Sequence, residues 1–150
     1  MTAARVVLFV CVENAARSLM AEAIFNADPA PGWTATSAGT RPARAPNPRT
    51  APMLSEIGLP MPDHPPRLLT PSLSEGAALP ITMGCLDDRS CPAHLKSLGP
   101  RDWNLPDPAP LDDRGFREVR DRISALVAGL RQELVRSGSG PIVPVPSSPR

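Results

Sequence analysis

Residues 5–26 read RVVLFVCVENAARSLMAEAIFN, and this stretch decides the fold. Its first part, 5–11, is a continuous valine-rich apolar run, which is typical of a parallel strand buried on both faces. Over 18–26 the apolar residues recur at helical spacing, and after a proline-rich break a second strand is expected over 33–38. A strand, a tight loop, a helix and a further strand make a βαβ unit, so the sequence predicts an α/β fold with a parallel sheet.

Weaker signals of the same kind continue along the chain. Apolar residues at helical spacing alternate with short apolar runs, and prolines and glycines separate them. Pro80 lies inside one expected strand, where it removes a backbone donor from the ladder. We expect a helix over 48–57, an extended segment over 64–70, a short helix over 71–75, a strand over 77–83, mostly loops over 85–112 and a long amphipathic helix over 113–137.

Length and composition limit the class of protein. The chain has 150 residues, 41% of them hydrophobic and 21% charged, with a formal net charge of +1. These values are typical of one globular domain, which we place at 1–138, followed by a proline- and serine-rich tail over 139–150 that we expect to be disordered. The charge argues against nucleic-acid binding, and no apolar run is long enough for a membrane span or a signal peptide. We expect a cytoplasmic protein and take it to be a monomer.

The chain has three cysteines, Cys11, Cys85 and Cys91. An odd number and the missing signal peptide do not suit a secreted disulfide framework. In a reducing compartment, cysteines with a chemical role are nucleophiles, metal ligands or redox pairs.

Cys11 ends the first expected strand, and Arg17 follows after five residues. In open α/β sheets, ligands bind at the carboxyl ends of the strands. A short loop between a strand and a helix can turn its backbone N–H groups inward, and the helix dipole favours an anion there. Asn14 tolerates the left-handed conformation that a tight loop needs. We therefore expect an oxyanion-binding loop made by Val12, Glu13, Asn14, Ala15, Ala16 and Arg17.

The residue types at the two ends of this loop indicate nucleophilic chemistry. The guanidinium of Arg17 is a planar fork that matches two oxygens of a tetrahedral anion. A cysteine near a helix N-terminus and a cation becomes a thiolate more readily, and Ser18 can donate a hydrogen bond to the sulfur of Cys11. The competing interpretation is a buried cysteine at a strand end beside a surface arginine. The strand, loop and helix context favours the nucleophile.

Four stretches resemble arsenate reductases built on the low-molecular-weight protein tyrosine phosphatase fold. The similarity extends from about residue 5 to residue 136. It implies a three-layer αβα architecture, with a four-stranded parallel sheet in the order 2-1-3-4 between helices. The stretches are VCVENAARSLMAEA at 10–23, SAGT at 37–40, TMGC at 82–85 followed by Cys91-Pro92, and DWNLPDP at 102–108.

The resemblance also implies roles for individual residues. Asp107 matches a general acid, and Cys85 and Cys91 match the thiols that reduce the arsenic adduct of Cys11. Arsenate is then the substrate, phosphate-like oxyanions bind the same loop, and thioredoxin or another redoxin is the external reductant. No bound cofactor is implied, although the resemblance allows a potassium ion beside Asn14 and Glu22.

Other interpretations remain open at this point. A phosphatase needs Cys11 and Asp107 but no second cysteine; yet Ala109-Pro110 follows Asp107-Pro108, and the chain has no tyrosine to flank an aryl group. A reductase can also use only Cys11 with an external small thiol and a redoxin. Cys85 and Cys91 with His94 supply only three zinc ligands, one fewer than a structural site uses. A non-catalytic phosphate-binding or redox-sensing module is the remaining alternative, and His64 is expected to be a loop or packing histidine.

Overall fold

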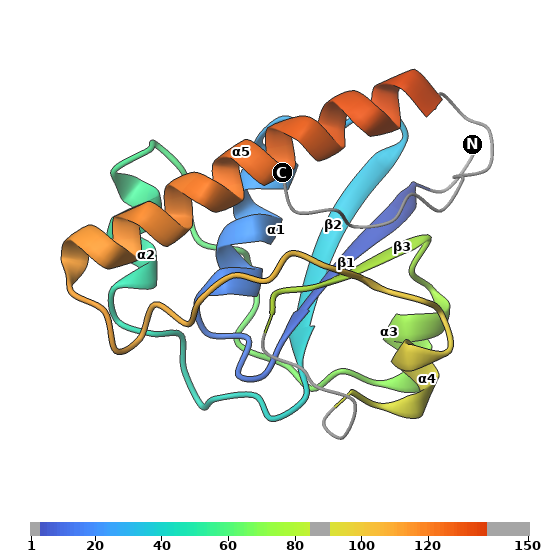
Figure 1. The fold of residues 1–150 in the computed structure, drawn as a ribbon, viewed down its shortest axis with the longest axis horizontal. Helices are drawn as coiled ribbons and strands as arrows, with labels where there is room; N and C mark the ends of the chain where they lie inside the picture. Colours follow the sequence, from blue (N-terminus) through green and yellow to red (C-terminus); the bar gives the residue numbers. More distant parts are fainter. Residues whose placement is uncertain (1–3, 85–90, 138–150) are drawn as a thin grey trace.

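The computed structural model describes residues 4–84 and 91–137, and its centre is one parallel sheet (Figure 1). The strand order is β2-β1-β3-β4, and every neighbouring pair is parallel. This confirms the expected α/β class and strand order. The strands are β1 (Arg5–Cys11), β2 (Trp33–Gly39), β3 (Leu79–Thr82) and β4 (Arg101–Asp102).

Helices cover the two faces of the sheet unequally. On one face lie the two longest helices and one short helix, and on the other lie two short helices (Figure 1). Within the described ranges, no helix is both long and apolar enough to cross a bilayer. The helices are α1 (Arg17–Ala27), α2 (Thr50–Ser55), α3 (Pro71–Glu75), α4 (Ala93–Lys96) and α5 (Asp113–Ser137).

Strand β1 is buried on both sides, as its unbroken apolar sequence predicts. Successive side chains of a strand point to opposite faces. Val7 and Phe9 belong to the larger core cluster with residues of α1 and α5. Leu8 and Val10 belong to the smaller cluster, which Leu95 of α4 completes. All four side chains are fully buried, so β1 is the element around which both layers assemble.

The second half of the sheet differs from the expectation in detail. Strand β3 is shorter than the predicted 77–83, and β4 pairs only with Ile81 and Thr82, so Pro80 has β1 as its one paired neighbour. The loops expected over 85–112 contain α4 and β4. Four- and two-residue elements are too short for periodicity to identify.

Helix α2 begins at Thr50, two residues later than predicted, and it is tied to α5 by charge. The Arg117 and Arg120 guanidinium groups hydrogen-bond to Glu56, which caps the end of α2. They lower the pKa of the Glu56 carboxyl to about 2.

The end of β2 passes very close to the loop that follows β1. A Cβ atom on Gly39 would lie 2.5 Å from the carbonyl oxygen of Val12 and 2.9 Å from the amide nitrogen of Asn14. Both are backbone atoms, which cannot rotate away as a side chain can. Gly39 is therefore required by space at this position.

Gly39→Ala should displace the loop after β1 and lower activity far more than it lowers stability. The matched control is Gly129→Ala in α5, where an added Cβ has no neighbour within 4 Å. That control should keep full activity and gain about 0.5–1 kcal/mol of unfolding free energy, because alanine is the better helix former. Urea unfolding and turnover of both variants measure the difference. Normal activity of Gly39→Ala would contradict the steric argument.

Candidate active site

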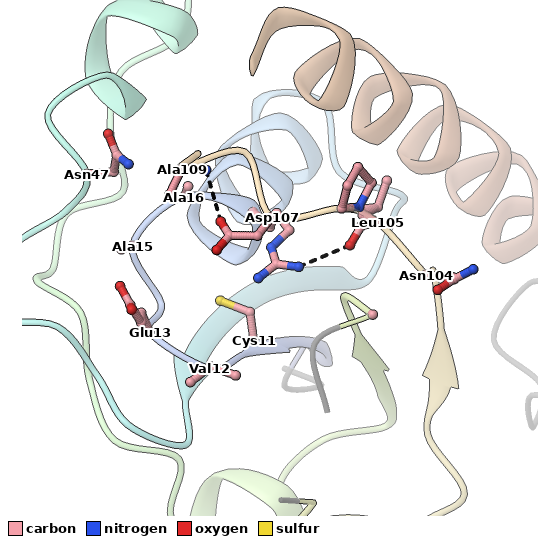
Figure 2. A pocket seen from close by; sticks show the side chains of 13 residues that line it. Cys11, Val12, Glu13, Ala15, Ala16, Asn47, Asn104, Leu105, Asp107 and Ala109 are labelled. Carbon is pink, nitrogen blue, oxygen red and sulfur yellow. Dashed lines mark hydrogen bonds between the residues drawn. The ribbon is translucent and has the colours of Figure 1, made fainter. Parts of the chain in front are cut away.

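A cavity of about 590 Å³ opens at the carboxyl ends of β1 and β3 (Figure 2). It brings together residues that follow each of the four strands, and Arg17 at the start of α1. Cys11, Arg17 and Asp107, which the sequence singles out, all line it. The remaining lining residues are Val12, Glu13, Ala15, Ala16, Asn47, Gly84, Asn104, Leu105, Pro106 and Ala109.

The loop 12–16 is fixed by hydrogen bonds that its carbonyl groups accept on the side away from the cavity. The neighbouring segment 40–47 donates backbone hydrogen bonds to three of them and to the carbonyl of Cys11 just before the loop. The Thr50 hydroxyl adds a bond of 2.8 Å to the carbonyl of Ala15. With its carbonyls turned outward, the loop has its N–H groups available on the inner side. The backbone bonds are Thr40 to Cys11 (3.2 Å), Arg41 to Val12 (2.8 Å), Ala43 to Glu13 (3.0 Å) and Asn47 to Ala15 (3.0 Å).

Two backbone features complete this anion site. Asn14 has a φ of 52°, the left-handed conformation that the sequence predicts for it. Helix α1 begins directly after Ala16, which provides no side-chain cap. The first N–H groups of an uncapped helix are the donors that bind an anion, and the helix dipole adds to the attraction.

The sulfur of Cys11 lies in a set of hydrogen bonds that favour a thiolate. Ser18 Oγ is 2.9 Å from Cys11 Sγ, and the backbone N–H of Asn14 donates to the same sulfur at 3.2 Å. The Asn14 side-chain amide donates to Ser18 Oγ at 2.7 Å. Because Ser18 accepts that bond, its own hydroxyl proton is available for the sulfur. Ser18 thus stands where the sequence predicts a donor to Cys11.

The same network continues away from the cavity. The Asn14 amide also donates to Ser37 Oγ at 3.0 Å, and Ser37 donates to Glu22 at 2.6 Å. His64 Nε2 lies 2.8 Å from the same carboxylate oxygen, and its Nδ1 lies 2.7 Å from the carbonyl of Pro65. Both ring nitrogens of His64 therefore have a polar partner, one a buried carboxylate and the other a backbone carbonyl. His64 therefore contacts the buried Glu22 and helps to fix its position, as expected for a packing histidine.

This arrangement bears on the potassium ion considered beside Asn14 and Glu22. The side-chain oxygen of Asn14 accepts a bond of 3.1 Å from the backbone N–H of Arg67, and Glu22 accepts from Ser37. Each of these oxygens therefore already accepts a hydrogen bond from the protein, and a potassium ion beside Asn14 and Glu22 stays a prediction.

Arg17 has a second role that the sequence did not reveal. Arg17 lines the cavity, and its guanidinium donates to the carbonyl oxygens of Leu105 at 3.0 Å and Met83 at 3.4 Å. The same side chain that faces the anion site thus fixes the end of β3 and the loop that carries Asp107. Gly84 allows this contact, because a Cβ there would lie 2.5 Å from the Leu105 nitrogen.

Asp107 lies in the cavity on the loop after β4. Its carboxylate accepts a bond of 3.0 Å from the Ala109 backbone N–H, which orients the side chain. Asn104, three residues earlier, has a φ of 52° and marks the turn of this loop. The sequence offered no independent signal for Asn47, Asn104 or Leu105 as lining residues, because their positions depend on tertiary contacts.

Neither of the two later cysteines is among the residues described as lining the cavity. Cys85 lies outside the described residues. Cys91 is half-buried and does not line the cavity; it packs on the smaller core cluster beside α4. His94, considered as a zinc ligand, faces Ser74 Oγ at 2.7 Å. In the described part of the chain, no three His, Cys, Asp or Glu residues gather as metal ligands would.

Comparison with known proteins places this geometry among related enzymes. The family model for low molecular weight phosphotyrosine protein phosphatase matches residues 6–139. Arsenate reductase 1 of Staphylococcus epidermidis is 28% identical over 123 residues, which are 82% of this chain and 92% of that protein. The crystal structure of an arsenate reductase from Archaeoglobus fulgidus is 32% identical with a TM-score of 0.69, and the match covers 85% of this chain and 99% of that one. A thioredoxin-dependent arsenate reductase from Corynebacterium glutamicum is 31% identical with a TM-score of 0.71, covering 87% of this chain and 62% of that one.

Ser18→Ala should make Cys11 a weaker nucleophile near neutral pH. A hydrogen bond to a charged group contributes about 1.5–3 kcal/mol, so its loss should slow alkylation of Cys11 about tenfold or more. Iodoacetamide labelling in phosphate-free buffer, followed by mass mapping of Cys11, measures the rate. Ser37→Ala is the control, because Ser37 belongs to the same network without touching the sulfur. Equal labelling of wild type and Ser18→Ala would show that this bond does not activate the thiol.

Proposed function

The chain belongs to the low molecular weight phosphotyrosine protein phosphatase family, and we propose that within this family it works as an arsenate reductase with Cys11 as its nucleophile. The observation that carries the proposal is the cavity, which Cys11, Arg17 and Asp107 line together. The relatives described above, which are named arsenate reductases, support the same activity. Residues 1–138 form the proposed catalytic unit.

In the first step, the Cys11 thiolate attacks the arsenic atom of arsenate. A sulfur–arsenic bond forms, and the bond to one oxygen breaks. Asp107 protonates that oxygen, so it leaves as water. The loop N–H groups and Arg17 stabilise the remaining oxygens, whose charge rises in the transition state. The product is an adduct in which arsenic is still pentavalent.

In the second step, Cys85 supplies electrons. Its thiolate attacks the Cys11 sulfur, a disulfide forms, and the sulfur–arsenic bond breaks. The bonding pair stays on arsenic, which becomes trivalent and leaves as arsenite. Two sulfur atoms are each oxidised by one electron, which balances the two-electron reduction. Gly84, which immediately precedes Cys85 in the sequence, lines the cavity with Cys11, and this supports the choice of Cys85.

In the third step, Cys91 takes over the disulfide. Its thiolate attacks Cys85, which releases Cys11 and leaves a Cys85–Cys91 bridge. Thioredoxin or another dithiol redoxin then reduces that bridge by thiol–disulfide exchange. Cys91 packs outside the cavity, where a disulfide would be separate from the anion site. The thioredoxin dependence of the corynebacterial relative supports this class of reductant.

Phosphatase activity is the second candidate, and one observation favours it. A thiolate, an arginine and an acid around one cavity also suit hydrolysis of a phosphate ester. Against it, no aromatic side chain is found among the described lining residues, and Ala109 follows the acid loop. An aryl leaving group therefore has no ring to stack on, and it should react slowly.

Two rates on one preparation should separate the candidates. We expect arsenate reduction to consume NADPH through a thioredoxin system, while a generic arylphosphate is hydrolysed slowly at best. Inorganic phosphate should inhibit competitively, because the loop binds both tetrahedral anions with the same donors. Cys11→Ser should abolish both rates, since a serine hydroxyl is not ionised at neutral pH. Fast hydrolysis without arsenate-dependent NADPH consumption would assign the chain as a phosphatase.

Replacing the later cysteines one at a time should stop the relay at different points. Cys85→Ser should form no internal disulfide after the arsenic adduct. Cys91→Ser should release one arsenite per chain and retain a Cys11–Cys85 bridge. Mass mapping of disulfides after one arsenate turnover reads both outcomes. If wild type and Cys91→Ser form no Cys11–Cys85 bridge, an external small thiol must resolve the adduct instead.

A further inference from the structure

The charge balance of the cavity is unusual for a site that binds anions. Among its described lining residues, Glu13 and Asp107 carry carboxylates and only Arg17 carries a positive charge. The two carboxylates already outnumber the one guanidinium, and a Cys11 thiolate adds a further negative charge. Asp107 has a role in the proposed mechanism, whereas the side chain of Glu13 has none.

Glu13 is held by its backbone and not by its side chain. Its carbonyl accepts a bond of 3.0 Å from the Ala43 N–H. The residue is exposed, and Figure 2 shows its carboxylate drawn apart from Asp107 in the view around Cys11. Within the described part of the chain, no hydrogen bond or ion pair reaches that carboxylate. Arg41 and Arg44 lie on the adjoining segment, but they do not line the cavity.

We propose that Glu13 is a specificity-determining residue that selects the ligand of this cavity by charge. It admits a compact tetrahedral anion and disfavours ligands that carry further negative charge beyond the tetrahedral group, such as diphosphates and acidic phosphopeptides. This inference rests on the proposed function, because it narrows the substrate class of the same site to small inorganic oxyanions.

The physical reason is the position at which a larger ligand would place its additional charge. The loop N–H groups and Arg17 hold the tetrahedral group, so any substituent on it points toward the mouth, where Glu13 is exposed. Each added negative charge at that point is repelled by the Glu13 carboxylate through the intervening solvent. At such a partly exposed site, the repulsion should weaken binding about three- to tenfold per unit charge. Added salt should reduce it, since the Debye length shrinks to about 3 Å at 1 M.

Binding without turnover tests the proposal directly. Cys11→Ser protein is titrated calorimetrically with inorganic phosphate and with pyrophosphate, with and without Glu13→Gln. We expect Glu13→Gln to tighten phosphate binding about threefold and pyrophosphate binding about tenfold or more at low ionic strength. Both gains should shrink at about 0.5 M salt. Glu75→Gln is the control, since it removes the same charge from an exposed position that does not line the cavity.

An unchanged phosphate-to-pyrophosphate ratio in Glu13→Gln would overturn the inference, as would an equal change in Glu75→Gln. Thermal unfolding of each variant verifies that it is folded at the titration temperature. The titrations involve no arsenate and no reductant. Failure of arsenate reduction would therefore refute the proposed function and leave the measured charge selectivity standing, and the reverse also holds.

Discussion

The inward turn of the loop between β1 and α1 is the constraint on which the rest of this structure depends. A loop that offers its N–H groups to an anion must place its carbonyl groups elsewhere, because buried carbonyls need donors. Here the segment after β2 supplies those donors, and Gly39 lets the two chains come close enough. The βαβ unit is thus more than a scaffold for Cys11. The segment that follows its second strand donates hydrogen bonds to the outward-facing carbonyls and so leaves the N–H groups of the loop available.

Arg17 fixes the segment on the other side of the cavity by hydrogen bonds to its backbone carbonyls. One end of its guanidinium fastens the loop of Asp107 through the Leu105 carbonyl, while the group as a whole lines the anion site. A lysine could supply the charge, but it could not direct donors along two fixed directions from one plane. Arg17, at the end of the loop 12–16, therefore connects that loop to the loop that carries Asp107, so the two loops are positioned together.

The sequence predicted those parts of the molecule that depend on local pattern. The run 5–11 indicated a strand buried on both faces, and Asn14 was expected in the left-handed region, which the structure confirms. The positions of Asn47 and Leu105 in the cavity, and the bond from Arg17 to Met83, depend on contacts between distant segments, which leave no periodic trace. Strand β4 has two residues, and so short a strand cannot be distinguished from a loop by alternation. The strand order itself was available only through resemblance to a family.

In the proposed mechanism, binding alone cannot separate arsenate from phosphate, since both ions would present tetrahedral oxygens to the same N–H groups and the same arginine. The proposed discrimination therefore lies in the step after binding. A thiol can reduce the sulfur–arsenic adduct because arsenic accepts the bonding electron pair and leaves as arsenite. Phosphorus in the same position does not accept that pair, so a thiol cannot reduce the corresponding adduct. On this view the cavity needs to be selective only against larger and more highly charged anions. An unneutralised carboxylate at its mouth can supply that selectivity with little cost for a small ion, so the site can tolerate phosphate as an inhibitor.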